Sequence, residues 1–326
     1  MILAGDIGGT HARLALFDVS RGQYAPVSLT VFPSHQFPSL DAIAAKFVAT
    51  TNVHPEAACF GIAGPVVNDR VEATNLPWTV EARSLAGQLQ IEKVKLINDL
   101  EANAWGIPAL AAKDLVALNQ VAGASGNQAV ISAGTGLGEA GMYWDGKSYH
   151  VFACEGGHSD YAPRNVLEVE LFGYVEKKFG HVSNERVLSG PGLVNIFDFL
   201  RDSGRGTPPQ WLQDEIQKSD PAAAISRAAT DGKCALAEQA LDLFIAIYGA
   251  EAGNLALKLL AIGGVFVGGG IAPKILSRLT KHNAFMEAFV SKGRMRSLME
   301  KISVQVIVND ETALLGAARY AALNLR

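Results

Sequence analysis

Val94-Lys95-Leu96-Ile97-Asn98-Asp99-Leu100 is a short apolar stretch that ends in an amide and a carboxylate. A helix-like run from Glu101 to Trp105 follows it directly. In open α/β sheets, ligands bind beyond the carboxyl ends of the strands, which is where a reacting carboxylate would lie. The pattern therefore makes Asp99 a candidate general base. The same residues allow a second interpretation, in which Asn98 or Asp99 only caps the helix, because both residue types are favoured there.

Length and composition predict a two-domain globular protein. The chain has 326 residues, which is more than one hydrophobic core usually sustains. Its hydrophobic content of 49% is too high for a disordered chain. The net charge is −4 and no basic block occurs, so we expect no nucleic-acid partner.

Cysteine usage and the chain start lead us to expect a soluble, cytoplasmic protein. Cys59, Cys154 and Cys234 are too isolated for a disulfide framework or a CxxC metal pair, which fits a reducing compartment. The first six residues have neither the basic flank nor the apolar run of a signal peptide. The apolar stretch from Leu255 to Ala272 contains Lys258 and several glycines, so it predicts a helix end, a turn, a strand and a glycine loop in place of a membrane span.

The N-terminus predicts a strand, a glycine turn and a second strand. The turn is Gly5-Asp6-Ile7-Gly8-Gly9-Thr10, and the strand that follows it runs from His11 to Asp18. A dinucleotide fingerprint would need a helix at that point. A glycine turn allows backbone N–H groups to approach an anion closely, Thr10 adds a hydroxyl donor, and Asp6 could hold a water of a magnesium ion. A tight hairpin that binds nothing is the alternative.

Alternating helices and strands continue the first domain. A helix is predicted from Leu40 to Thr50 and a strand from Ala57 to Ala63. Asn75, in the stretch Thr74-Asn75-Leu76-Pro77-Trp78, could bind a polar small molecule or simply form a turn.

The second domain repeats the arrangement of strand, glycine turn and strand. Ala129 to Ser132 is followed by Gly134-Thr135-Gly136-Leu137-Gly138 and then by a strand from Glu139 to Trp144. The repeat suggests a duplicated architecture with both loops on one cleft. The stretch from Gly141 to Ser148 fits the letters of the P-loop pattern, but Asp145-Gly146 is a hairpin signal and a strand follows it, so we reject a P-loop.

Further along the chain, a core helix is predicted from Leu236 to Leu260 by its apolar spacing. A helix is expected to start at Pro221. Val265-Phe266-Val267 leads into Gly268-Gly269-Gly270, and a helix is expected directly after these glycines, a turn that suits a flat ring or a diphosphate. A last strand, Ser303 to Val308, precedes a terminal helix from Glu311 to Leu325, which we expect to pack on the first domain.

Taken together, these motifs resemble bacterial glucokinase. The matching stretches are Gly5 to Thr10, Leu96 to Asp99, Ala133 to Gly138, Glu155-Gly156-Gly157-His158, Glu185-Arg186 with Leu188-Ser189-Gly190, and Gly268 to Gly270. They span nearly the whole chain in the right order. The related ROK sugar kinases carry a cysteine-rich zinc motif, but no cysteine stands between Cys154 and Cys234, so we expect no zinc.

The resemblance implies the two-domain hexokinase/actin-like ATPase (ribonuclease H-like) fold, an α/β fold with a central cleft. The small domain would be residues 1–107 completed by the C-terminal helix 309–326, and the large domain residues 108–308. It also implies transfer of the ATP γ-phosphoryl group to the 6-hydroxyl of glucose, with Mg²⁺ carried by ATP and not by the protein, and a homodimer.

The resemblance further assigns roles to individual residues. Asp99 is the implied base. The implied glucose ligands are Asn98, Asp99, Glu155, His158 and Glu185, to which the sequence adds Asn75. The implied nucleotide site is made of Gly5, Asp6, Ile7, Gly8, Gly9, Thr10, Gly134, Thr135, Gly136, Gly268, Gly269 and Gly270.

Two other functions are weighed against this one. The first is a kinase of the same fold that acts on another small molecule such as acetate; carboxylate binding would favour Arg at the positions of Glu155, His158 and Glu185. The second is a non-catalytic, actin-like nucleotide-binding regulator.

Overall fold

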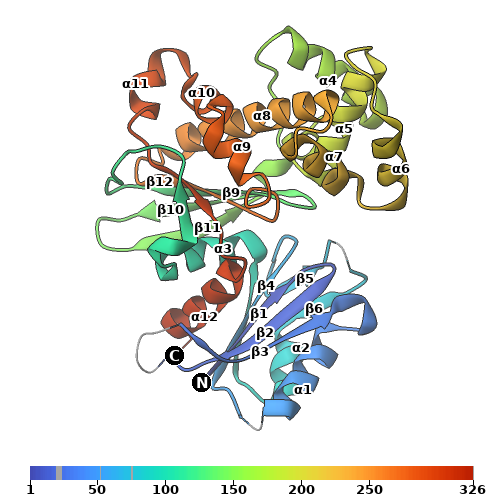
Figure 1. Ribbon diagram of the computed structural model, residues 1–326. Coiled ribbons are helices and arrows are strands. Elements are labelled where there is room, and N and C mark those ends of the chain that lie inside the picture. The colour runs from blue at the N-terminus through green and yellow to red at the C-terminus, as the bar shows by residue number, and fades with distance from the viewer. Residues whose placement is uncertain (20–23, 52, 75, 326) are drawn as a thin grey trace. The chain divides into compact units, whose positions relative to one another are not determined.

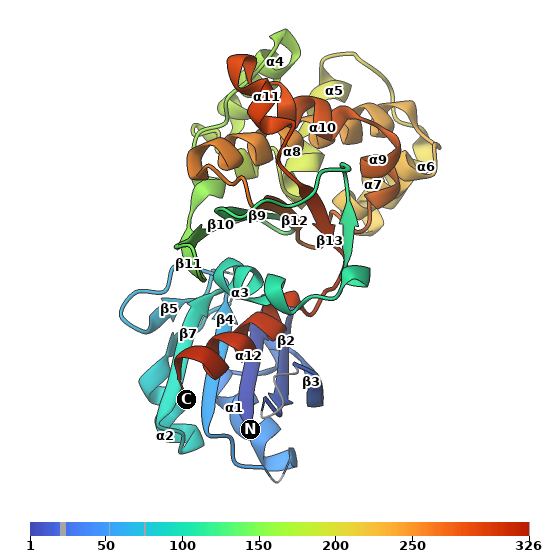
Figure 2. The same ribbon diagram turned by 90° about the vertical axis from the view of Figure 1, so that its left-hand side faces the viewer.

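The structure of the chain is a computed structural model that describes residues 1–19, 24–51, 53–74 and 76–325. It divides into two compact units (Figures 1 and 2). Unit 1 comprises Met1–Asp114, Val151–Ala153 and Asn309–Arg326, and unit 2 comprises Leu115–His150 and Cys154–Val308. The chain therefore passes from unit 2 back to unit 1 directly before its last helix.

Unit 1 contains a five-stranded mixed sheet in the order β3-β2-β1-β4-β7. Its strands are β1 (Ile2–Ile7), β2 (His11–Phe17), β3 (Pro26–Pro33), β4 (Ala57–Ile62) and β7 (Lys93–Asn98). A separate hairpin pairs β5 (Arg70–Glu72) with β6 (Thr79–Glu81). The helices are α1 (Leu40–Thr51), α2 (Ala82–Leu89), α3 (Asp99–Gly106) and α12 (Thr312–Asn324), with short 3₁₀ turns η1 (Ser34–Gln36), η2 (Ile107–Ala109) and η3 (Ala112–Asp114).

Alternation along the strands of unit 1 assigns successive side chains to opposite faces of the sheet. Leu3 and Ile7 of β1 belong to one buried cluster, in which α1 and α2 supply Ile43, Phe47 and Leu85. Ile2 and Ala4 of the same strand belong to a second cluster, which contains α3 and α12 residues. The terminal helix thus packs on β1 and β4 of the first sheet. By the same alternation, Asp6 is on the face of the sheet that α3 and α12 cover.

Unit 2 contains a six-stranded sheet in the order β11-β10-β9-β12-β13-β8. Three residues of β11, Val151–Ala153, are assigned to unit 1. Its strands are β8 (Leu115–Ala117), β9 (Gln128–Ala133), β10 (Leu137–Trp144), β11 (Tyr149–Cys154), β12 (Gly264–Gly268) and β13 (Val304–Ile307). The helices are α4 (Val166–Phe179), α5 (Gly190–Asp202), α6 (Gln210–Lys218), α7 (Pro221–Thr230), α8 (Ala235–Leu259), α9 (Leu276–Lys281), α10 (Ala284–Val290) and α11 (Arg296–Met299). The 3₁₀ turns are η4 (Gly156–His158), η5 (Asn184–Arg186) and η6 (Gly293–Met295).

Helix α8 is the centre of the core of unit 2. Figure 1 shows it with α5, α7 and α10 on the same side of the sheet. Its length and composition would allow it to cross a membrane, but 72% of its most apolar window is buried inside the protein. Because a helix that is apolar all round needs apolar neighbours, this burial is that of a core helix.

Most of the predicted elements are confirmed with small shifts. The predicted helices at Leu40, Pro221 and Leu236 are present as α1, α7 and α8, and both glycine turns connect antiparallel strands. The stretch from Gly141 to Ser148 is a hairpin in which the Asp145 carboxylate accepts hydrogen bonds from the backbone N–H groups of Lys147 and Ser148, so it is not a P-loop.

Three boundaries differ from the prediction. The strand expected to end at Asp99 ends at Asn98, and Asp99 is the first residue of α3, because the Asn98 side chain caps that helix. The second glycine turn is shorter than expected, since β10 starts at Leu137. The helix expected directly after Gly270 is wrong, because residues 269–275 form turns and α9 starts only at Leu276.

Candidate functional site

Asp99 and Asn98 occupy the junction between β7 and α3. The Asn98 Oδ1 accepts hydrogen bonds from the backbone N–H groups of Leu100 (2.8 Å) and Glu101 (3.3 Å), and its Nδ2 donates to the Gly64 carbonyl (3.1 Å). Asn98 is therefore the N-cap of α3, as the second interpretation of the sequence proposed. Asp99 is partly exposed, and its Oδ1 accepts from the N–H of Leu100 at 2.9 Å. Capping by Asn98 fixes the first turn of the helix that carries Asp99.

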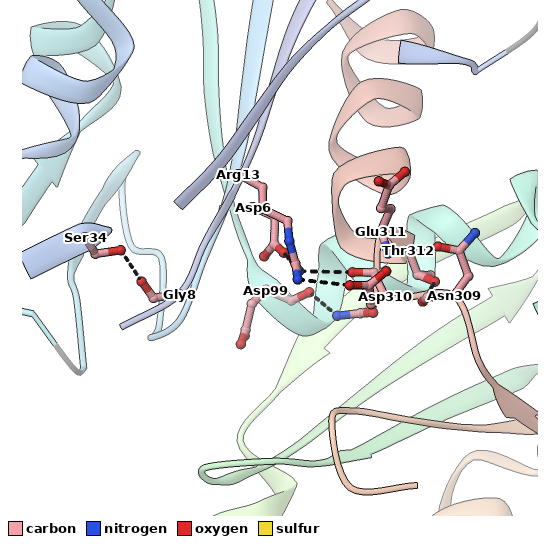
Figure 3. A network of polar contacts seen from close by, with 10 residues as sticks. Asp6, Gly8, Arg13, Ser34, Asp99, Asn309, Asp310, Glu311 and Thr312 are labelled. Carbon is pink, nitrogen blue, oxygen red and sulfur yellow. Dashed lines mark hydrogen bonds and ion pairs between the residues drawn. The ribbon is translucent and has the colours of Figure 1, made fainter. Parts of the chain in front are cut away.

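Asp6 is held by an arginine on the neighbouring strand. Arg13 donates to Asp6 Oδ2 (3.3 Å), and to the backbone carbonyl (3.1 Å) and Oδ2 (3.0 Å) of Asp310 (Figure 3). Burial raises the pKa of Asp6, and the Arg13 charge opposes that rise. Because Asp310 lies two residues before the start of α12, Arg13 ties the first glycine turn to the segment by which the chain re-enters unit 1.

The first glycine turn is held by hydrogen bonds from residues outside the turn. Gly8 N–H donates to the His11 carbonyl (2.9 Å), and Ser34 of η1 donates from Oγ to the Gly8 carbonyl (2.8 Å; Figure 3) and from N–H to the Thr10 carbonyl (2.9 Å). These bonds fix the carbonyl side of the turn. Thr10 is exposed.

The second glycine turn is joined to Glu185. The Glu185 Oε2 accepts from the backbone N–H of Leu137 at 3.0 Å, and a methyl group at Gly136 would lie 2.4 Å from the same oxygen. A side chain at Gly136 would therefore displace this carboxylate from its place beside the turn. The turn also closes on itself, since Gly134 N–H donates to the Gly136 carbonyl at 2.8 Å.

The segments that carry Glu155, His158 and Glu185 lie together in unit 2. The backbone N–H of Asn184 donates to the Ser159 carbonyl (2.9 Å), and the Asn184 Nδ2 donates to Ser159 Oγ (3.1 Å). These bonds connect η4 with η5. A methyl at Gly157 would lie 2.0 Å from the Leu137 carbonyl, so η4 also packs directly on the second glycine turn. Glu155 and His158 themselves are exposed.

The third glycine loop requires glycine for two reasons. Gly269 has a φ of 82°, and a methyl group on it would lie 2.3 Å from the Ala133 carbonyl. Tyr248 of α8 fixes both strand ends, because its hydroxyl accepts from the Ala133 N–H (3.1 Å) and shares its one proton between the carbonyls of Ile131 (3.2 Å) and Gly268 (3.3 Å). The second and third glycine loops are therefore held side by side by one buried hydroxyl.

A pocket of about 850 Å³ opens beside these two loops. Its wall includes residues at the N-termini of α5 and α7 and three cationic side chains, Lys178, Arg186 and Lys274. Lys178 donates to Asn195 Oδ1 (3.0 Å), and Arg186 stacks on Phe179 with its guanidinium 4.1 Å from the ring centroid. Backbone N–H groups, helix N-termini and cations suit an anionic ligand, and a pocket of this size suits a whole nucleotide.

Three of the residues predicted for the nucleotide site belong to the wall of this pocket. Gly134, Thr135 and Gly270 line the pocket, and Asn75 lies outside the described residues. The pocket residues from α4, α5 and α7 and the cation Lys274 were missed by the sequence analysis. The sequence held a signal for some of them, because Gly190-Pro191-Gly192 and Asp220-Pro221 both mark helix starts. No group of three or more His, Cys, Asp or Glu side chains suited to a metal ion occurs within the described part of the chain.

Comparison with known proteins gives one family along the whole chain. The family model described as Glucokinase matches residues 3–324. The glucokinase of Nostoc sp. is 45% identical over 341 residues, which cover 99% of each protein. The crystal structure of a glucokinase from an Antarctic psychrotroph has a TM-score of 0.84 at 33% identity, covering 98% of this chain and 97% of its own. The glucokinase of Balamuthia mandrillaris, solved in complex with glucose, shares the fold with a TM-score of 0.81 at 22% identity, covering 98% and 93%.

The matches include both units and every motif described above, and they leave only the first two and last two residues of the chain outside the family model. Since a family model spans nearly the full chain and a relative is 45% identical over 99% of it, the chain belongs to the glucokinase family.

Proposed function

We propose that the protein is an ATP-dependent glucokinase that phosphorylates the 6-hydroxyl of glucose to give glucose 6-phosphate and ADP. The observation that carries the proposal is the full-length match to the Glucokinase family, at 45% identity to the Nostoc sp. enzyme. The α/β units with their mixed sheets agree with a two-domain sugar kinase. We assign them to the hexokinase/actin-like fold, with residues 1–107 and 309–326 as the small domain and 108–308 as the large one.

Phosphoryl transfer needs mainly positioning and charge stabilisation from the protein, because its transition state is loose. In the proposal, Asp99 accepts the proton of the attacking hydroxyl. Asp99 is in the first turn of α3, which Asn98 caps, so the backbone that carries the carboxylate is held in place. The Asn98 Oδ1 is committed to that cap, so a bond from Asn98 to the sugar would use its amide nitrogen.

Glucose binding is assigned to Asn98, Asp99, Glu155, His158 and Glu185, with Asn75 as a further candidate. The hydrogen bonds between η4 and η5 support a common role for the three unit 2 residues. A site built from such side chains would discriminate against sugars that lack the matching hydroxyl, because its polar groups would then be left unpaired.

ATP is assigned to the glycine loops and the adjoining pocket. In this assignment, the Gly134–Gly136 and Gly268–Gly270 loops contact the phosphates together with the turn from Gly5 to Thr10, and the nucleoside fills the pocket beside α5 and α7. Mg²⁺ would neutralise charge on the phosphates when it is bound. Since this ion usually keeps several waters and binds through one or two carboxylates plus phosphate, Asp6 fits as a ligand through water.

The proposal includes a cytoplasmic homodimer. The three cysteines support the compartment, because Cys59, Cys154 and Cys234 are all free thiols. Sedimentation of the purified protein would test the dimer.

A coupled assay of ADP formation over a panel of sugars tests the function. We expect turnover that depends on glucose, with the 6-phosphate as product by ³¹P NMR, and little turnover with 6-deoxyglucose. ATP hydrolysis that is indifferent to every sugar would contradict a glucokinase and favour an actin-like regulator. Phosphorylation of acetate in preference to glucose would favour the other kinase.

The assignment of ATP to the pocket predicts a role for Lys274. This exposed side chain lines the pocket and has no ion-pair partner among the described residues. Because a hydrogen bond to a charged group contributes about 1.5–3 kcal/mol, Lys274→Ala is expected to raise the KM for ATP about tenfold or more. The matched control is Lys147→Ala in the β10–β11 hairpin, which should leave this KM unchanged. A rise in the Lys147 variant alone would contradict both the pocket assignment and the rejection of the P-loop.

A further inference from the structure

Glu139 is a buried carboxyl group that the proposed mechanism does not use. It lies on β10 opposite Ile131 of β9, and only 1% of its surface is exposed. Its Oε1 has no hydrogen-bond partner within the part of the chain that the structure describes. Since an isolated buried carboxylate is strongly unfavourable, such a group keeps its proton unless the surroundings change.

The carboxyl of Glu139 supports the segment that carries Glu155 and His158. A methyl group at Gly156 would lie 1.9 Å from Glu139 Oε2, so the carboxyl touches the backbone of that segment. The Cys154 thiol donates to the Glu139 carbonyl at 3.4 Å, which joins the residue before the segment to the same position of β10. The Glu139 side chain therefore helps to set the position of Gly156.

A second buried carboxyl group, that of Glu251, explains why the proton is on Glu139. Glu251 of α8 is 3% exposed, but its oxygens are paired with Lys258 (3.3 Å) and with Asn254 Nδ2 (2.8 Å). Burial raises the pKa of Glu139 to about 7, and the Glu251 charge adds to the rise while Lys258 opposes it. Two further titratable groups interact with the Glu139 charge, namely Cys154 and Tyr248 of α8, and burial together with this charge raises the pKa of both.

We propose that Glu139 is a positioning residue for the segment from Glu155 to His158, and that this segment binds sugar best when Glu139 is protonated. The inference rests on the proposed sugar site. The Glu139 carboxyl is already closed off from water and touches Gly156, so its charged form would have to disturb this contact to gain a partner, and the segment would leave its sugar-binding position. Binding of sugar is thus coupled to uptake of a proton, and by linkage the affinity falls as the pH rises through the titration of Glu139.

The test compares Glu139→Gln, the neutral isostere, with the wild-type protein. In the wild type, the KM for glucose is expected to rise by up to about tenfold from about pH 6 to about pH 8.5, since one unit of pKa shift on binding corresponds to a tenfold change in affinity. The kcat should change less than this KM. The Glu139→Gln variant should keep the low KM over the whole range. Glu176→Gln, an exposed position on α4, should follow the wild-type profile.

Titration calorimetry with glucose separates the inference from the proposed function. We expect proton uptake on glucose binding near pH 7 in the wild type and less uptake in Glu139→Gln, measured in two buffers with different ionisation enthalpies. Glucose binding without turnover would overturn the kinase proposal while still testing Glu139. Equal proton uptake and parallel KM profiles in both proteins would overturn the role of Glu139, as would a failure of the wild type to bind glucose.

A double-mutant cycle tests the contact itself. Gly156→Ala should raise the KM for glucose, because its methyl group overlaps Oε2 of Glu139. Combining it with Glu139→Ala removes the overlapping atoms, so the double variant should bind glucose better than Gly156→Ala alone. Purely additive effects would contradict the contact, because residues that do not touch usually give additive free-energy changes.

Discussion

Asparagine in place of Asp99 is expected to lower kcat for glucose phosphorylation by about 10²- to 10⁴-fold, the usual contribution of a general base. The KM for glucose should change far less, because the asparagine keeps the shape of the side chain and can still accept the hydrogen bond from Leu100 N–H. Asn98, the residue that caps α3, is unaltered, so the helix should form as before. A loss in kcat with retained binding is the signature of an interaction made only in the transition state.

The control for this variant lies on the same helix. Glu101 is in the first turn of α3, and burial raises the pKa of its carboxyl. Glu101→Gln removes one carboxylate from the same helix turn, so any general effect of charge at the helix start should appear in both variants. We expect kcat of Glu101→Gln within a few-fold of the wild-type value. Equal losses in the two variants, or a loss below about tenfold in Asp99→Asn, would contradict the assignment of Asp99 as base.

Local sequence patterns predicted the elements that depend on neighbouring residues. Helix α8 follows from apolar residues at helical spacing. Asp220-Pro221 marks the start of α7, where the Asp220 carboxylate accepts from Ala222 and Ala223 N–H groups. The two glycine turns between apolar strands were predicted from local sequence as well. In each of these cases the determining residues lie within one or two helical turns of each other.

Elements that depend on distant partners were not predicted. The edge strand β3 has exposed Val27, Leu29 and Val31, and it is a strand because β2 offers a free edge beside it. Likewise, β8 has only three residues and pairs with β13, which is far along the chain. Pairing over such distances cannot be derived from the composition of a short segment.

The candidate site likewise contains residues that local sequence could single out and residues that it could not. Asn98 and Asp99 could be singled out from their position at a strand end, although sequence left open whether they cap or react. Glu139 was read only as the first residue of a strand. Its one signal is a carboxylate at an inward position between Leu137 and Gly141, and its contact with Gly156 depends on how η4 folds over β10.

The packing of α3 against α12 leads to the second large prediction. A methyl group at Gly316 of α12 would lie 1.7 Å from the Ala102 carbonyl and 2.7 Å from the Gly106 nitrogen, both of them backbone atoms of α3. Neither can move without moving the helix. On its other side, α3 packs on Gly61 of β4, where a methyl group would lie 2.7 Å from Ala102 Cβ. Helix α3, which begins with Asp99, therefore cannot move away from α12 without colliding with β4.

Gly316→Ala is consequently expected to lower the free energy of unfolding by about 2 kcal/mol or more, at the upper part of the usual range for overpacking. Because α3 must shift, kcat should also fall, and a displacement of about 1 Å at a catalytic group can reduce the rate about 100-fold. Chemical denaturation and steady-state kinetics measure the two effects.

Gly173→Ala is the matched control, since Gly173 is also inside a helix, α4, and a methyl group there would meet nothing within 4 Å. In that open position alanine should stabilise the helix by about 0.5–1 kcal/mol, because glycine loses more backbone freedom on folding. The two glycine-to-alanine changes should therefore have opposite signs. If Gly316→Ala were as stable as the wild type, α3 and α12 could not be in backbone contact. If it were destabilised with an unchanged kcat, the position of Asp99 would not depend on this helix pair.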